Sequence, residues 1–85
     1  MRQFDCIVTS ELGLHARPAG LLVKEANRFA SKVTVKFGDK CADAKKIFSL
    51  LGLGAKQGES VSILIDGEDE DEAASALEQL AQEEL

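Results

Sequence analysis

Three short segments of the sequence carry apolar residues at alternate positions, which is the pattern of a β-strand buried on one face. These segments cover residues 4–10, 32–37 and 60–65. A Gly-Asp-Lys turn after the second predicts a hairpin whose returning strand covers 41–44. The residues expected to face inward are Phe4, Cys6, Val8, Val33, Val35, Phe37, Val61, Ile63 and Ile65. Strands with one apolar face favour an antiparallel or largely antiparallel sheet.

In the remaining segments the apolar residues recur at the spacing of a helix. Residues 16–29 predict an amphipathic helix, residues 45–54 a short helix closed by a glycine, and residues 66–85 a last helix with an acidic start. The apolar residues expected in the core are Leu22, Ala26 and Phe29 in the first helix and Ala73, Leu77, Leu80 and Ala81 in the last. This β-α-β-β-α-β-α order predicts an α+β fold, with four strands in one sheet and the helices on one face.

The length of the chain limits what it can do. Its 85 residues support one modest core, so we expect a single domain over residues 1–85. Such a domain has room for a surface site but not for a deep substrate cleft. A binding or carrier module is therefore favoured over an ordinary metabolic enzyme.

Charge is divided unevenly along the chain. All ten Lys and Arg residues lie between Arg2 and Lys56, whereas ten of the fifteen acidic residues lie from Gln57 onward. The negative total and the lack of a basic run argue against nucleic acid as a partner. The basic half either faces an acidic protein surface or is simply solvated.

The two cysteines, Cys6 and Cys41, are far apart and form no CxxC pair, which predicts two reduced thiols rather than a disulfide. The first ten residues lack the apolar run of a signal peptide, and no apolar run reaches the length of a membrane span. We therefore expect a cytoplasmic location without membrane insertion.

The segment "LGLHARPAG", residues 12–20, contains the only histidine and the only proline. Pro18 suits the first turn of a helix, where the N–H groups of Ala16 and Arg17 have no partner and attract an anion. The helix dipole there favours the neutral, nucleophilic form of the His15 imidazole, and Arg17 adds phosphate-matched donors. These groups fit a phosphoryl group carried on His15, although a lone histidine near a helix start is more often a cap or a surface residue.

The motif "GLHARPA", residues 13–19, resembles the active-centre signature of the histidine-containing phosphocarrier (HPr) family of the bacterial phosphoenolpyruvate-dependent sugar phosphotransferase system. The resemblance extends over the chain, through "LVKEANRF" after the motif, "ADAKKIFSLLGLGAKQGESVSI" in the middle and "GEDEDEAASALEQL" near the end. It implies an open-faced sandwich of four antiparallel strands with three helices on one side.

The same resemblance implies a mechanism. Phosphorylated enzyme I would transfer its phosphoryl group to Nδ1 of His15, which would pass it to the histidine of an enzyme II A component. Arg17 would stabilise the phosphate and the charge of the transition state. The carrier would need no metal or cofactor, and a monomer is expected because one face must meet successive partners.

In the family, partners bind at the start of the first helix and at the short second helix. The resemblance therefore implies a partner-binding surface in this chain, which we call the docking face. It consists of Ala16, Arg17, Gly20, Ile47, Phe48 and Leu51. Residues 45–54 are too apolar for an ordinary surface helix, which supports this assignment. Leu50 and Leu53 are expected to be buried. Gly20 inside a helix costs about 1 kcal/mol relative to alanine, which either close approach of a partner or helix–sheet packing would explain.

One position departs from the family pattern. Many members have a regulatory serine at the start of the second helix, where this chain has Lys46, so control by phosphorylation at that site is not expected. Ser49 lies one turn along and is interpreted as a plain surface serine. Lys45 and Lys46 are expected to attract acidic partner surfaces.

Three other functions are alternatives to the sugar phosphocarrier. A related carrier in a nitrogen-related or regulatory branch would use the same chemistry and end at a signalling protein, and the sequence does not separate the two branches. A non-catalytic interaction module would use Phe48, but the presence of both His15 and Arg17 argues against it. A small enzyme is disfavoured because no second catalytic group can be named.

Overall fold

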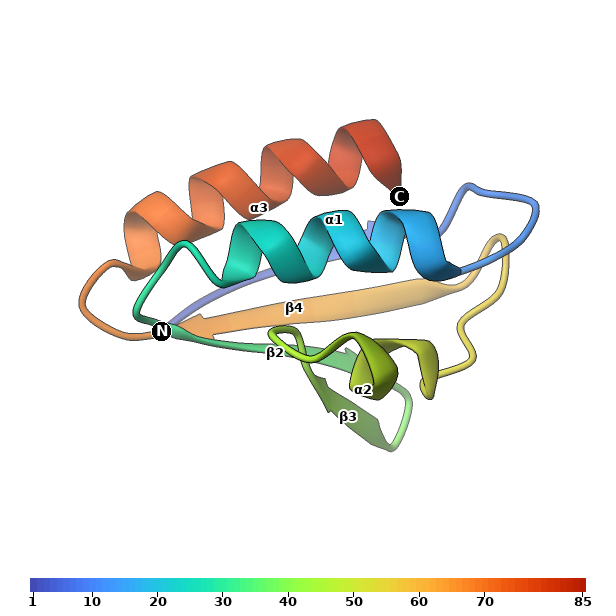
Figure 1. The fold of residues 1–85 in the computed structure, drawn as a ribbon, viewed down its shortest axis with the longest axis horizontal. Coiled ribbons are helices and arrows are strands. Elements are labelled where there is room, and N and C mark those ends of the chain that lie inside the picture. The colour runs from blue at the N-terminus through green and yellow to red at the C-terminus, as the bar shows by residue number, and fades with distance from the viewer.

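The computed structural model describes all of residues 1–85, and it has the expected element order (Figure 1). The strands and helices are β1 (Arg2–Ile7), α1 (Ala16–Ala26), β2 (Lys32–Phe37), β3 (Lys40–Asp43), α2 (Ile47–Leu51), β4 (Ser60–Asp66) and α3 (Glu70–Glu84). No helix is long and apolar enough to cross a membrane.

The four strands form one sheet in the order β1-β4-β2-β3, and every neighbouring pair is antiparallel. One row across the sheet joins Phe4, Ile63, Val35 and Ala42, all on the inner face. The next row carries polar residues such as Asp5 and Ser62, whose hydroxyl donates to the carboxylate at 2.6 Å. The alternation therefore separates an apolar face from an open polar face, and the antiparallel prediction is confirmed.

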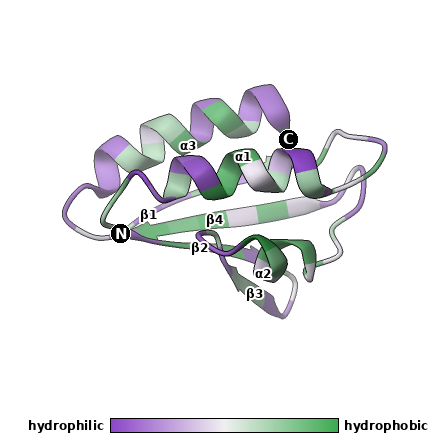
Figure 2. Cartoon of the chain, in the orientation of Figure 1, coloured by the Kyte–Doolittle hydropathy of each residue, from purple (hydrophilic) through white to green (hydrophobic).

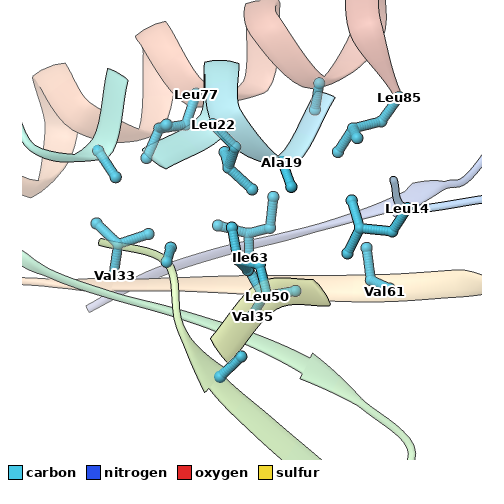
Figure 3. Close-up of a cluster of buried hydrophobic side chains, with 14 of the residues drawn as sticks. Leu14, Ala19, Leu22, Val33, Val35, Leu50, Val61, Ile63, Leu77 and Leu85 are labelled. Atoms are coloured by element: carbon cyan, nitrogen blue, oxygen red, sulfur yellow. The ribbon is translucent and has the colours of Figure 1, made fainter. Parts of the chain in front are cut away.

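The helices cover the apolar face. α1 and α3 lie side by side over the sheet, and α2 lies beside β3 (Figure 1). Leu22 and Leu77 point from the two long helices toward Ile63, and Leu50 comes up from α2 beside Val35 (Figure 3). All five side chains are fully buried, and each buried leucine contributes about 1.5–3 kcal/mol to stability.

The inner residues expected from the sequence all lie in the core or pack against it. Leu50 and Leu53 are buried, as expected. The predicted end of the first helix was less accurate than the predicted core. α1 ends at Ala26 rather than near Phe29. Phe29 still packs against the core, but from the turn that follows the helix. After Ala26 the chain tightens into a turn, in which the N–H groups of Arg28 and Phe29 donate to the carbonyls three residues back.

Both cysteines are free thiols, with Cys41 exposed and Cys6 half-buried on the inner side of β1. Burial, aided by the nearby Asp5 carboxylate, raises the pKa of the Cys6 thiol to about 11. Iodoacetamide near pH 8 is therefore expected to alkylate Cys41 more than about tenfold faster than Cys6, because only the thiolate reacts. Peptide mass spectrometry over time measures both rates, and urea-unfolded protein serves as the control in which they should converge. Equal rates in the folded protein would contradict this account.

Asp69 joins the turn after α1 to the turn before α3. Its carboxylate accepts hydrogen bonds from the N–H groups of Ala30 at 2.8 Å and Ser31 at 2.9 Å, and from the Ser31 hydroxyl. The two turns are so close that a Cβ on Gly67 would lie 2.6 Å from the Ser31 Cα. The contact secures the end of the molecule opposite to the first turn of α1.

The Asp69→Ala variant is expected to lower the melting temperature most near neutral pH. The Ser31 hydroxyl and then the Ala30 N–H hold the pKa of the Asp69 carboxyl below its ordinary value. A group with a lowered folded-state pKa stabilises the fold above its unfolded pKa of about 3.9 and loses that effect as the pH falls through its folded value. Thermal melts of both proteins from neutral to acidic pH should show the difference shrinking below about pH 4. A difference independent of pH would count against this role.

Candidate functional site

His15 is the N-cap residue of α1. Its backbone is extended, and its carbonyl accepts the first helical hydrogen bond, from Ala19 N–H at 3.1 Å. Its side chain makes no capping hydrogen bond, although a capping role was the ordinary alternative for this residue. The half-exposed imidazole is therefore free for another use.

The loop before His15 is fixed by backbone contacts. Gly13 has a positive φ of 71°, and its N–H donates to the Ser10 carbonyl at 2.9 Å. The next N–H, of Leu14, donates to the Ala55 carbonyl at 2.9 Å, and the Leu14 side chain is buried in the core. A Cβ on Gly13 would lie 2.6 Å from the Ala55 oxygen, so only glycine fits. The sequence did not predict this anchoring of the loop, because it depends on Ala55, which is distant from the loop along the chain.

The first turn of α1 presents unpaired donors. The N–H groups of Ala16 and Arg17 make no backbone hydrogen bond, and Pro18 has no N–H to offer. The first turn contains no acidic residue that would occupy these donors or oppose an anion. Aligned peptide dipoles place partial positive charge at this helix end. The arrangement can hold an anionic group beside the imidazole of His15.

Arg17 is exposed on the same turn and takes part in no salt bridge. By contrast, Arg28 in the turn after α1 pairs with Glu25. The guanidinium of Arg17 is thus free to bind a phosphate near His15 with two parallel hydrogen bonds.

The structure brings the residues of the docking face onto two adjoining helices. Gly20 of α1 lies against α2, where the position of a Cβ would be 3.6 Å from the Ile47 Cδ1 atom and near nothing else. A Cβ at this position would thus make only an ordinary van der Waals contact with α2, so helix–sheet packing does not require this glycine. α2 is hydrophobic along its length (Figure 2). Ile47 and Leu51 are half-buried, whereas Phe48 is 85% exposed.

Two polar residues around α2 differ from expectation. The ammonium of Lys45 donates to the Phe29 carbonyl at 2.7 Å, a contact that the sequence did not predict, and Lys45 keeps its positive charge because no acidic residue pairs with it. Lys46 is exposed. Ser49 is not a plain surface serine, because it is half-buried and its hydroxyl oxygen accepts the Asp43 N–H at 3.1 Å. These contacts join segments that are distant or irregular, and no local pattern in the sequence predicts them.

The surroundings of His15 contain no cleft. The hollow in the surface lies elsewhere, between β1 and α3, and its lining residues are Arg2, Gln3, Phe4, Ala74, Ser75 and Glu78. No three His, Cys, Asp or Glu side chains come together as a metal site. The candidate site is thus an open surface around one imidazole, which a large partner can cover.

Comparison with known proteins decides the family. Residues 2–83 match the family described as the PTS HPr component phosphorylation site. The chain belongs to the HPr family of phosphocarrier proteins. The phosphocarrier protein HPr of Lysinibacillus sphaericus is 45% identical over 98% of this chain and 94% of its own length.

Solved structures of HPr proteins have the same fold. The crystal structure of HPr-C-His from Thermoanaerobacter tengcongensis is 37% identical, covers 99% of this chain and 94% of that one, and has a TM-score of 0.92. The crystal structure of an HPr dimer from the same organism, also 37% identical, covers 98% and 95% of the two chains with a TM-score of 0.77. The open-faced fold of the HPr family is therefore confirmed, with four antiparallel strands and three helices.

Proposed function

We propose that residues 1–85 act as one phosphocarrier domain that accepts a phosphoryl group on Nδ1 of His15 from phosphorylated enzyme I. The acceptor is an enzyme II A component, and the pathway serves sugar uptake in the cytoplasm. The observation that carries the proposal is the position of the His15 imidazole at the start of α1. It makes no capping hydrogen bond and lies beside two unpaired backbone N–H groups. Membership of the HPr family of the phosphotransferase system supports it.

In the proposed reaction, the lone pair of Nδ1 attacks the phosphorus atom. The bond between phosphorus and enzyme I breaks, and its electron pair remains on enzyme I. In the second transfer, an imidazole of enzyme II A attacks the phosphorus atom on His15. The P–N bond to His15 breaks, and its electron pair returns to Nδ1 of His15. Transfer requires positioning and charge stabilisation more than covalent chemistry by the protein.

The chain supplies that stabilisation from α1. The N–H groups of Ala16 and Arg17 and the partial charge of the helix start would bind the phosphoryl oxygens. The guanidinium of Arg17 would bind them from the side chain. These donors are fixed before the partner arrives, so little reorganisation is needed during transfer.

The docking face fits a protein partner rather than a small substrate. Phe48 exposes its ring on α2, and an exposed aromatic side chain is a frequent centre of binding energy once a partner covers it. The donor and the acceptor would use this face in turn, so the carrier would meet one partner at a time. A monomer presents the face freely, and the dimeric HPr structure from Thermoanaerobacter tengcongensis makes light scattering in solution the test of that state.

A reconstituted relay tests the proposal. Phosphoenolpyruvate, enzyme I, this protein and an enzyme II A component are mixed, and phosphorylation of the last component is followed. We expect transfer with the wild type and none with His15→Ala, whose circular dichroism should match the wild type. Phosphorylation of enzyme II A through the His15→Ala variant would contradict the proposal. Transfer only to a nitrogen-related acceptor would place the chain in the regulatory branch.

A further inference from the structure

Two side chains connect the end of α1 to the segment before α2. The side-chain amide of Asn27 donates to the Val23 carbonyl at 2.9 Å and to the Lys45 carbonyl at 3.2 Å. In the opposite direction, the ammonium of Lys45 donates to the Phe29 carbonyl at 2.7 Å. The two residues therefore fasten the end of one helix to the start of the other.

The segment that leads into α2 is also held from its other sides. The Ala44 N–H donates to the Val33 carbonyl of β2 at 3.0 Å, and the Lys45 N–H donates to the Asp43 carboxylate at 2.9 Å. The Asp43 N–H in turn donates to the Ser49 hydroxyl of α2. The residues before α2 are thus bound to α1, to β2 and to α2 itself.

α2 needs such support, because a helix of five residues is far below the length that is stable alone. Leu50 holds its inner side in the core. Nothing comparable holds its outer side, where Phe48 is exposed. The direction in which Phe48 points relative to His15 therefore depends both on the packing of α2 against the core and on how α2 is fastened to α1.

We propose that Asn27 and Lys45 are positioning residues for partner binding. They hold α2 against α1 so that one partner surface meets Phe48 and the His15 imidazole at the same time. This inference rests on the proposed phosphocarrier function. A preformed docking face spares the partner the cost of ordering α2 during binding, which raises affinity without any contact to Asn27 itself.

The test compares variants as substrates of enzyme I. Asn27→Ala removes two hydrogen bonds without changing charge, and Lys45→Met keeps the aliphatic stem but removes the ammonium. Each is expected to raise the KM of enzyme I for this protein about three- to tenfold, with kcat nearly unchanged. Lys45→Arg, which still donates to the Phe29 carbonyl, should restore most of the affinity.

Two controls separate positioning from other causes. The rate of His15 phosphorylation by phosphoramidate, a small donor that needs no docking face, should be the same in all variants. Lys46→Met removes an exposed charge next to Lys45, and its effect should vanish at high salt. The rise in KM caused by Asn27→Ala should persist at high salt. The backbone amides of Ile47–Leu51 should also exchange with solvent faster in this variant than in the wild type.

An unchanged KM in Asn27→Ala would overturn the inference, and so would an equal fall in the phosphoramidate rate, which would place the effect on His15 itself. If Asn27→Ala does not fold, Lys45→Met and its rescue by arginine decide the question in the same way. Failure of enzyme I to phosphorylate the wild type would overturn the proposed function, and this inference with it.

Discussion

Arg17→Ala is expected to slow phosphoryl transfer from enzyme I about a hundredfold, mainly through kcat. The guanidinium lies on the first turn of α1, is exposed and has no acidic partner within the protein. It is therefore available to neutralise charge on the phosphoryl group as the bond order changes. Rapid-quench measurements at saturating concentrations of the carrier give the rate of the chemical step.

Arg28→Ala is the matched control for Arg17→Ala, because Arg28 pairs with Glu25 and lies in the turn after α1, far from the first turn of the helix. Its transfer rate should equal that of the wild type. Arg17→Lys should recover part of the rate, since lysine keeps the charge but not the paired donors. A transfer rate for Arg17→Ala within twofold of the wild type would remove Arg17 from the mechanism.

Phe48→Ala is expected to weaken binding to enzyme I about thirtyfold, which corresponds to the roughly 2 kcal/mol of a strong interface contact. The ring is 85% exposed, so its loss should change the free energy of unfolding by less than about 0.5 kcal/mol. The combination of a large binding effect with an unchanged melt is what distinguishes a contact residue from a core residue. Titration calorimetry and thermal melts measure the two quantities.

Ile7→Ala is the control for Phe48→Ala, since Ile7 is an apolar residue that is 52% exposed on β1, away from α2. Its binding to enzyme I should not change. If Ile7→Ala weakened binding as much as Phe48→Ala, the interface would not be confined to the docking face. Wild-type affinity in Phe48→Ala would contradict the assignment of Phe48.

Much of the fold could be predicted from the sequence, because its signals are local. The alternation around Val33 and Ile63 predicted strands that bury one side, and the antiparallel sheet confirmed it. The position of His15 before a first-turn proline predicted its place at the start of α1. These patterns depend on the preferences of single residues and on their spacing.

The rest depends on contacts between distant segments, which no short pattern records. The hydrogen bonds of Asp69 to Ser31 and of Lys45 to the Phe29 carbonyl arise only after the chain has folded. The same reason explains why the sequence did not predict the hydrogen bond of the Asn27 side chain to the Lys45 carbonyl. Side chains that bond to distant backbone groups set these details of the site.

Phosphorus NMR and intact mass after incubation with phosphoenolpyruvate and enzyme I test the central claim most directly. The wild type is expected to gain one acid-labile phosphoryl group with the resonance of an Nδ1 phosphohistidine, and His15→Ala is expected to gain none. A phosphoryl group that survives acid, or one that the His15→Ala variant still acquires, would show that His15 is not the carrier residue.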